Sequence, residues 1–405
     1  MNALILRLHR LLPIVAVNIA LSVLLIALVE FLSSLVVLIP GGNLTQDARL
    51  NHTWRPHSSW THQEWIEQNP DFPQPYVHHY NRQGWIEEYD IQKKKPAQTY
   101  RIFYLGDSFT EGTCPMNQSV PSIVERCLNA RGTGGEWTFE VINTGTSSYS
   151  PTLFYLLARY VIADYAPDAL VVNVDMTDDF DDWKYSQTLI RDAEGNPLFA
   201  PCRNIYQSGY IDTENGMIKA TLRAKLQLFL MQHSYTYNVM AQIRSKLLAK
   251  NAESAAPDSA NMSEERYPRW AWCQYAWDDA TARNVNNTLD LLRRLALWCR
   301  QHRINMMLTG VPHYWQYAGN PNGSGEPRWS HRPHDALAAL AKEFEMPYLD
   351  SYQALQPIIA GAPQTKFYYA ENMHFNPRGY AAWAEAHCRF LTDQTNRLLP
   401  KEFWQ

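Results

Sequence analysis

The chain has 405 residues, of which 46% are hydrophobic and 19% are charged, so it can bury a large core. Its formal net charge is −4 and its longest basic run is Lys93-Lys94-Lys95, so the charge pattern does not indicate a nucleic-acid-binding protein. At roughly 100–200 residues per domain, the length allows two or three domains, and a single α/β domain with a long insertion fits equally well.

An apolar segment near the N-terminus, from Leu11 to Leu38, is interrupted by one acid, Glu30. It is long enough to cross a bilayer, which takes about 20 residues. Two arginines precede it, and the next charge after it is Asp47, so the positive-inside rule places the N-terminus in the cytoplasm and exports the rest. A cleaved signal peptide is the alternative, but its apolar region should span only about 7–15 residues. We therefore predict an uncleaved single-pass anchor over residues 1–40.

The rest of the chain divides into an extension and a catalytic domain. Residues 41–99 are rich in aromatic residues and proline, and we predict a stalk that becomes a packed N-terminal extension. Residues 100–400 form the expected catalytic domain, with an insertion at about 180–279 where the regular pattern breaks. Among the six cysteines, a disulfide is most plausible for Cys202 and Cys273.

Short apolar runs alternate with amphipathic segments through the catalytic domain. The pattern predicts strands at 101–105, 138–143, 169–175, 304–311 and 347–350, and helices at 119–130, 152–164, 280–302, 333–345 and 377–398. Strands that alternate with helices favour a parallel sheet covered on both faces.

The first of these strands ends in Gly106-Asp107-Ser108. An open α/β sheet binds its ligands at the carboxyl ends of its strands, so Ser108 stands where chemistry is expected. A serine nucleophile needs a base, a group that orients the base, and donors for an oxyanion. Glu371-Asn372-Met373-His374, in the loop before the last predicted helix, offers His374 as base and Glu371 as the orienting acid.

The pairing of Gly-Asp-Ser near the start with acid-x-x-His near the end resembles the SGNH (GDSL-type) hydrolase superfamily. The resemblance covers about 101–182 and 284–398. It implies a three-layer α/β/α sandwich with a mostly parallel five-stranded sheet, and the hydrolysis or transfer of acyl esters. It also implies a Ser108–His374–Glu371 triad.

The resemblance further implies an oxyanion hole made by Ser108, Gly145 and Asp178. Gly145 follows the second strand and would donate its backbone N–H. Asp178 stands where the superfamily usually has asparagine, and an ionised carboxylate cannot donate a hydrogen bond, which puts hydrolytic competence in question. Four acids between 178 and 182 could form a cation site, but a solvated loop or helix start is favoured. No metal and no cofactor are predicted.

We therefore expect a serine esterase or O-acyltransferase acting on acyl, most simply acetyl, esters of a cell-envelope glycan. Its expected location is the inner (plasma) membrane, with the catalytic domain in the periplasm or outside the cell. The expected partners are an acylated glycan or lipid substrate, the membrane and a membrane-bound acyltransferase, with no nucleic acid. A lysophospholipase or thioesterase, and a non-catalytic glycan-binding or assembly subunit, remain as alternatives.

Overall fold

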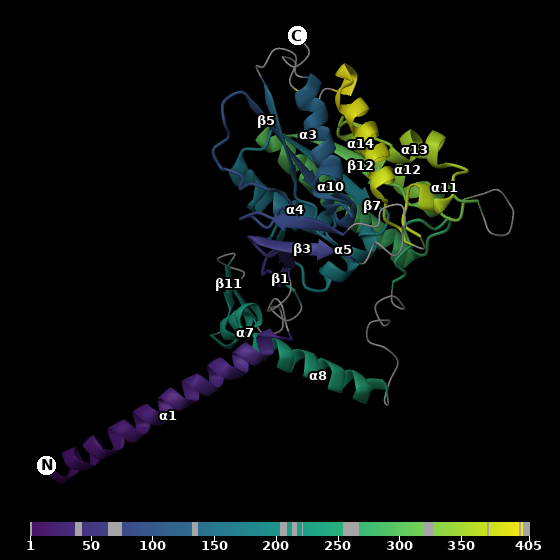
Figure 1. The fold of residues 1–405 in the computed structure, drawn as a ribbon. Coiled ribbons are helices and arrows are strands. Elements are labelled where there is room, and N and C mark those ends of the chain that lie inside the picture. The colour runs from purple at the N-terminus through teal and green to yellow at the C-terminus, as the bar shows by residue number, and fades with distance from the viewer. Residues whose placement is uncertain are drawn as a thin grey trace.

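The computed structural model describes residues 2–36, 43–63, 75–131, 137–202, 209–212, 217–220, 222–253, 267–319, 327–370, 372–396 and 398–399. Its centre is a five-stranded sheet in the order β13-β12-β7-β5-β6, parallel throughout, with helices on both faces (Figure 1). This is the three-layer α/β/α sandwich expected from the sequence.

The central strands are continuous apolar runs because helices cover both sides of the sheet. Their bounds are Thr99–Leu105 (β5), Thr138–Asn143 (β6), Ala169–Asp175 (β7), Asn305–Val311 (β12) and Tyr348–Leu349 (β13). Every residue of β5 and of β7 is buried. β5 pairs with β6 on one side and with β7 on the other, so the chain reverses its direction of progress across the sheet at β5. Ligands of open α/β sheets bind at such a switch point.

Alternate residues of each strand enter separate apolar clusters on the two faces. Phe103 and Leu105 pack on one side, whereas Ile102 and Tyr104 pack on the other. The first face is covered by Pro151–Tyr160 (α4), Asp279–His302 (α10) and Arg332–Glu343 (α12), and the second by Val120–Arg131 (α3), Ser351–Ile359 (α13) and Pro377–Leu391 (α14).

The predicted strands 138–143 and 169–175 have the observed bounds. The predicted helix 377–398 ends earlier, at Leu391, and a short 3-10 turn, Gln394–Asn396 (η4), follows it. Helix α13, which contains Pro357, was not predicted. The remaining short elements are Ser108–Glu111 (α2), Tyr314–Tyr317 (α11), Met116–Gln118 (η1), Ile162–Tyr165 (η2) and Gln364–Lys366 (η3).

The segment before the first central strand packs against the catalytic domain through short hairpins. They pair Leu44–Gln46 (β1) with His52–Trp54 (β2), and Ser58–His62 (β3) with Tyr76–Tyr80 (β4). Leu50, Trp85 and Ile91 are buried in the cluster that holds α4 and α10. These residues therefore extend the hydrophobic core of the catalytic domain.

Between β7 and α10 the chain leaves the sheet. It forms Asp178–Ser186 (α5), Ile190–Arg191 (β8), Pro197–Phe199 (β9), Gly209–Asp212 (β10), Met217–Ala220 (β11), Leu222–His233 (α7) and Tyr235–Glu253 (α8). The thiol of Cys273 is buried 3.6 Å from the carbonyl oxygen of Met176. It forms no disulfide, so the pairing considered for Cys202 and Cys273 is wrong.

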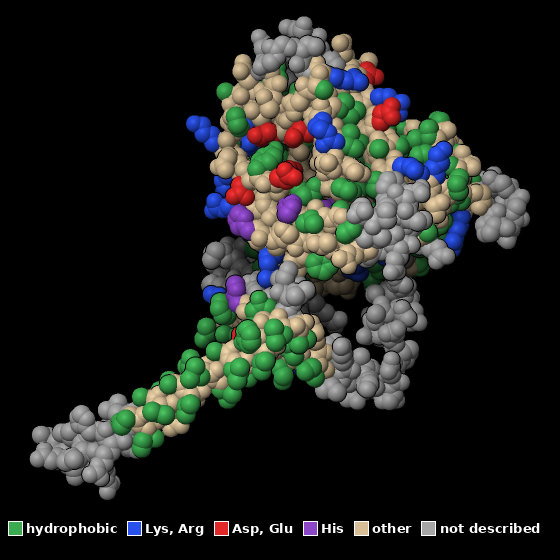
Figure 2. Space-filling model, in the orientation of Figure 1, with side chains coloured by type: hydrophobic (Ala, Val, Ile, Leu, Met, Phe, Trp, Pro, Cys, Tyr) green, Lys and Arg blue, Asp and Glu red, His purple; other side chains and the backbone are tan. Residues whose placement is uncertain are grey.

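The N-terminal helix Asn2–Ser34 (α1) projects away from the domain (Figure 1). Its segment Pro13–Ser34 has a mean hydropathy of 2.5, none of its apolar window is buried, and it qualifies as a membrane span by length and composition. Exposed hydrophobic side chains cover the described part of this helix, from Ile14 to Leu32 (Figure 2). Near its end, the Glu30 carboxylate accepts hydrogen bonds from the backbone N–H groups of Tyr235 and Thr236, at 2.5 and 3.1 Å. Glu30 therefore caps the N-terminus of α8 from outside that helix.

Candidate active site

Ser108 is the first residue of α2, directly after β5 and Gly106-Asp107. The Asp107 carboxylate caps this four-residue helix by accepting the backbone N–H of Phe109 at 2.9 Å. Gly106 has no room for a side chain, because an added Cβ would lie 2.0 Å from Oγ1 of Thr110. The strand end, the cap and the tight packing together hold the serine at the carboxyl edge of the sheet.

His374 lies next to Ser108, although 266 residues separate them in the chain. The distance from Ser108 Oγ to His374 Nε2 is 2.7 Å. The ring of His374 is buried and stacks on Phe109, with 4.8 Å between ring centroids. The predicted nucleophile and the predicted base are therefore in contact.

The other ring nitrogen of His374 contacts Asn372. Asn372 Oδ1 lies 2.7 Å from His374 Nδ1 and also accepts the His374 backbone N–H at 3.0 Å. An oxygen that accepts the backbone N–H must be the acceptor for Nδ1–H as well. Nε2 is then left with its lone pair toward Ser108, which is the tautomer that a general base needs.

The orienting residue in this arrangement is thus Asn372, in the position that the sequence analysis gave to Glu371. Glu371 itself lies outside the described residues. Asparagine can orient a histidine as a carboxylate does, but it brings no negative charge.

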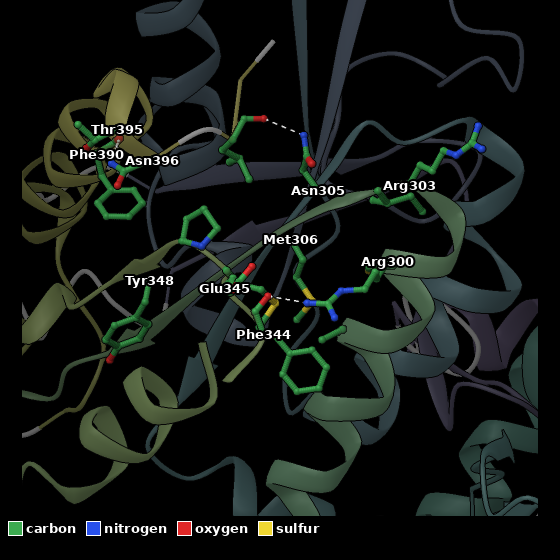
Figure 3. A pocket seen from close by; sticks show the side chains of 16 residues that line it. Arg300, Arg303, Asn305, Met306, Phe344, Glu345, Tyr348, Phe390, Thr395 and Asn396 are labelled. Carbon is green, nitrogen blue, oxygen red and sulfur yellow. Dashed lines mark hydrogen bonds between the residues drawn. The ribbon is translucent and has the colours of Figure 1, made fainter. Parts of the chain in front are cut away.

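A pocket of about 530 Å³ contains Ser108 and His374. The N-terminal extension forms one wall with Asn43, Trp54 and Trp60, and Arg269 reaches the pocket from the last part of the predicted insertion. Sequence reasoning missed all four of these lining residues. A pocket of about 720 Å³ lies at the opposite end of the sheet, beside the start of β12, and contains neither Ser108 nor His374 (Figure 3).

Two predicted oxyanion residues do not face this pocket. The backbone N–H of Gly145 donates to Asn143 Oδ1 at 3.0 Å, and a Cβ at Gly145 would lie 2.2 Å from the backbone nitrogen of Glu111. This glycine is needed because β6 and α2 approach closely. Asp178 is fully buried, and its Oδ2 accepts the backbone N–H of Asp175 at 3.1 Å. The structure therefore corrects both assignments, and Asp178 does not oppose an oxyanion in the pocket.

Other backbone donors border the pocket. Within the described part of the chain, the N–H groups of Ser108 and Ser148 have no hydrogen-bond acceptor. Both residues line the pocket, and Ser148 has a left-handed backbone with φ of 61°. These two N–H groups are the candidate oxyanion donors. Ser108 was among the predicted donors, and Ser148 was not.

The acidic run after β7 is the buried start of α5, and not a solvated loop. Asp178 and Asp179 are fully buried, and each has a pKa raised well above its usual value, mainly by burial. Asp182 accepts hydrogen bonds from Ser150 Oγ at 2.5 Å and the Thr152 N–H at 2.9 Å. The run is therefore part of the domain interior.

A buried ion pair lies behind the serine and histidine. Asp175 Oδ1 is 2.5 Å from His313 Nε2, and the His313 ring stacks on Phe109. Burial alone would raise the pKa of Asp175, but His313 and the donors of Thr177 outweigh it and lower the pKa to about 2. The neighbouring Asp107 has its pKa raised well above the usual value, first by burial and then by the Asp175 charge. Asp175 is thus the ionised carboxylate of this group.

The pKa of His374 is lowered to about 3, mainly by burial; the Asp175 charge raises it, and the nearby His313 and Arg269 lower it. The imidazole is consequently neutral, and able to accept a proton, over a wide pH range.

We expect Asn372→Ala to lower kcat on an acyl ester by about 100-fold or more, because His374 loses the acceptor that fixes its tautomer. Glu371→Ala, one residue away, tests the sequence-based assignment in the same assay. Steady-state kinetics on a soluble acetyl ester, with thermal unfolding to verify the fold, would measure both. If Glu371→Ala loses activity and Asn372→Ala does not, the sequence-based assignment of Glu371 is right.

The depressed pKa of His374 also predicts the pH profile. Only the neutral imidazole accepts the serine proton, so kcat/KM should change little between pH 7 and pH 5. A histidine with the ordinary pKa of about 6.5 would lose about 25-fold over this range. The measurement is kcat/KM against pH, with recovery after return to pH 7 to exclude unfolding. An acid limb centred near pH 6.5 would contradict the burial argument.

Comparisons with known proteins add little to this geometry. No family model matches the chain, and no curated protein matches it. Three solved structures are similar to it at low identity. An acetylxylan esterase from Geobacillus stearothermophilus is 12% identical, with 74% of this chain and 97% of that chain covered and a TM-score of 0.40.

A two-domain esterase active on acetylated mannans is 11% identical, with 75% of this chain and 51% of that chain covered and a TM-score of 0.37. A lipolytic protein of the G-D-S-L family from Desulfitobacterium hafniense DCB-2 is 10% identical, with 72% and 98% covered and a TM-score of 0.35. At these scores the likenesses carry no argument about function, which depends on the geometry around Ser108.

Proposed function

We propose that the protein is a serine esterase or O-acyltransferase that acts on acetyl esters of a cell-envelope glycan. The observation that carries this proposal is the 2.7 Å contact between Ser108 Oγ and His374 Nε2 in a pocket at the switch point of the sheet. A serine hydroxyl in contact with a neutral, oriented imidazole is the basic requirement for acyl transfer through a covalent intermediate.

In the proposed reaction Ser108 Oγ attacks the ester carbonyl while His374 Nε2 takes its proton. The N–H groups of Ser108 and Ser148 would donate to the oxyanion, and the positive charge of Arg269 would add to its stabilisation. The protonated His374 then gives its proton to the leaving alcohol. Water or a second hydroxyl, activated by His374 in turn, removes the acyl group from Ser108. The choice between these two acceptors separates an esterase from an acyltransferase.

Asn372 orients His374 but carries no charge of its own. Asp175 is the ionised carboxylate nearby that raises the pKa of His374. We propose that it stabilises the imidazolium through space, across the Phe109 ring that stacks on both His313 and His374. Coulomb attraction at this range is effective because the groups are buried.

The walls of the pocket support a glycan ester as the substrate. Trp54 and Trp60 line it together with polar residues, and Trp60 is 41% exposed. An exposed aromatic face beside hydrogen-bonding groups suits a sugar ring, because the ring has one apolar side and a rim of hydroxyls. The acetylated xylan and mannan on which two of the structural neighbours act are substrates of this class.

We also propose that α1 is a retained anchor in the inner membrane, with the catalytic domain exported. The contact between Glu30 and the start of α8 supports retention, because cleavage after residue 34 would remove this cap from a folded helix. The neighbouring surface of α7 and α8 exposes Leu226, Phe229 and Met240. These side chains would lie at the membrane surface beside the anchor. A membrane-bound acyltransferase could supply acyl groups there.

We expect Ser108→Ala to remove turnover of acetyl esters and labelling by a fluorophosphonate probe, because both need the hydroxyl. Ser147→Ala, in the same pocket, is the control and should still be labelled. Activity of the full chain would be measured on p-nitrophenyl esters from acetyl to dodecanoyl and on an acetylated glycan.

The proposal requires acetyl esters to react at least about tenfold faster than long-chain esters. A preference for long chains would favour the lysophospholipase or thioesterase alternative. Absence of labelling in correctly folded wild-type protein would favour a non-catalytic subunit.

The retained anchor predicts the mass of the mature protein. Intact-mass spectrometry of the chain purified from membranes should give a species that still contains residues 13–34, and alkaline carbonate should not extract it. A soluble product that begins near residue 40 would show a cleaved signal peptide.

A further inference from the structure

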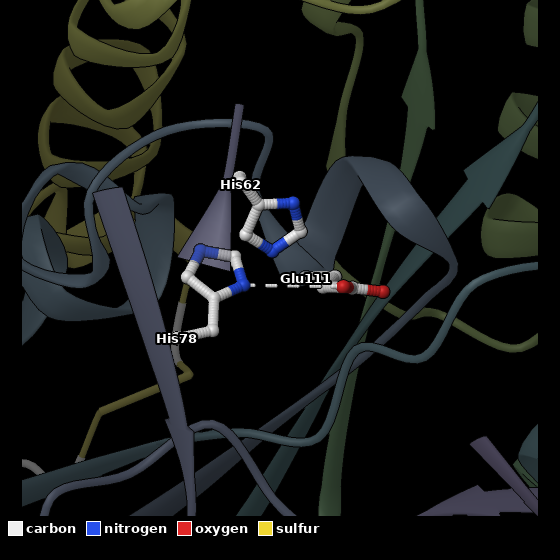
Figure 4. Close-up of side chains that lie close together, drawn as sticks. All are labelled: His62, His78 and Glu111. Atoms are coloured by element: carbon white, nitrogen blue, oxygen red, sulfur yellow. Dashed lines mark ion pairs between the residues drawn. The ribbon is translucent and has the colours of Figure 1, made fainter. Parts of the chain in front are cut away.

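Two histidines of the N-terminal extension meet an acid of the serine-bearing helix. His62 ends β3 and His78 lies in β4, where Trp60 pairs with His78 in the antiparallel register. The burial of β4 alternates, so His78 points inward and His79 points outward. Glu111 is the last residue of α2. Ligand atoms of His62, His78 and Glu111 all lie within 4.8 Å of one another, and all three residues are buried (Figure 4).

The groups around this cluster orient it as the supporting groups of a metal site do. Glu111 Oε2 accepts the Ser147 backbone N–H at 3.0 Å and the Ser147 hydroxyl at 2.8 Å, which directs Oε1 toward His78. His78 Nε2 donates to the carbonyl oxygen of Cys114 at 2.9 Å. Histidines that bind metals usually donate their other N–H to a carbonyl or carboxylate in this way.

The same hydrogen bond sets the tautomer of His78. Because Nε2 carries the proton, Nδ1 of the neutral ring presents a lone pair, and Glu111 Oε1 lies 3.9 Å from it. A lone pair and a carboxylate oxygen that face each other need a cation or a proton between them. The 3.9 Å separation is wide for a direct hydrogen bond. Two ligands on a tetrahedral Zn²⁺, each at about 2.0–2.2 Å from the ion, lie about 3.3–3.6 Å apart, so the two atoms would move together by a few tenths of an ångström on binding.

We propose that His62, His78 and Glu111 bind one divalent transition-metal ion, with Zn²⁺ as the best match. Two imidazole nitrogens and one carboxylate oxygen are a donor set that Zn²⁺ favours, and three protein ligands leave a fourth position open. His62 and Glu111 both line the pocket that holds Ser108 and His374. The open position therefore belongs to that pocket, where water or a substrate oxygen would complete the coordination.

Such an ion would join the extension to the catalytic helix. α2 begins with Ser108 and ends with Glu111, so the ion fixes the end of the helix opposite the serine. Its binding does not depend on the proposed esterase activity, and activity is not needed to detect it.

The test uses the full chain in detergent, purified without a polyhistidine tag and stripped with a chelator. Isothermal titration with Zn²⁺ should give one tight equivalent per chain, and saturating Zn²⁺ should raise Tm by about 5 °C or more. His78→Gln should lose this equivalent and the Tm shift. His79→Gln, on the opposite face of the same strand, should keep both.

His62→Gln provides a second variant at the pocket wall, in case His78→Gln does not fold. Thermal unfolding and circular dichroism of the metal-free variants would establish that each is folded. The proposal is overturned if wild-type protein binds no Zn²⁺, since a proton then joins His78 to Glu111. It is equally overturned if folded His78→Gln and His62→Gln both retain the equivalent, since the ion then binds elsewhere.

Discussion

The proposed function of this chain depends on one hydrogen bond between side chains 266 residues apart, Ser108 Oγ and His374 Nε2. The parallel sheet makes it possible, because all its strands end at the same edge and the chain reverses its progress across the sheet at β5. Two local caps then refine the positions. Asp107 caps the helix of the serine, and Asn376 caps α14 just after the histidine by accepting two backbone N–H groups.

Burial of charge determines the chemistry around this hydrogen bond. His374 is kept neutral by the apolar surroundings, Asp107 and Asp178 have raised pKa values, and Asp175 remains ionised beside His313. The pKa of one carboxylate near the base is therefore lowered, while the pKa values of its neighbours are raised. This separation arises because two carboxylates at such short distance cannot both ionise in a buried site.

Much of the fold could be read from the sequence, since buried parallel strands are continuous apolar runs and amphipathic helices lie between them. Ser108 and His374 could be predicted for the same reason. Ser108 follows a recognisable strand, and His374 lies just before a recognisable helix. The contact between Asn372 and His374 was not predicted, because it depends on the conformation of a turn. The role expected of Glu371 stays a prediction, because that residue lies outside the described part of the chain. An asparagine accepts the backbone N–H two residues ahead, and this local preference was the available signal.

Other features of the site depend on packing that no local pattern encodes. Gly145 follows a strand as an oxyanion glycine would, yet the close approach of α2 explains it. Ser148 has a left-handed backbone, but the sequence did not indicate it because the position is neither glycine nor asparagine, the residues that usually adopt this conformation. The meeting of His62 with His78 depends on the register of a hairpin, and the contribution of Arg269 depends on where a long insertion returns to the domain.

The short connection between α1 and the pocket limits where the proposed esterase could act. The apolar span ends at Ser34 and the first pocket residue is Asn43, nine residues later. Even fully extended, nine residues reach only about 30 Å. For a retained anchor, the acyl groups within reach are those held close to the bilayer, such as on lipid-linked or nascent polymers, and a distant cell-wall layer would be inaccessible.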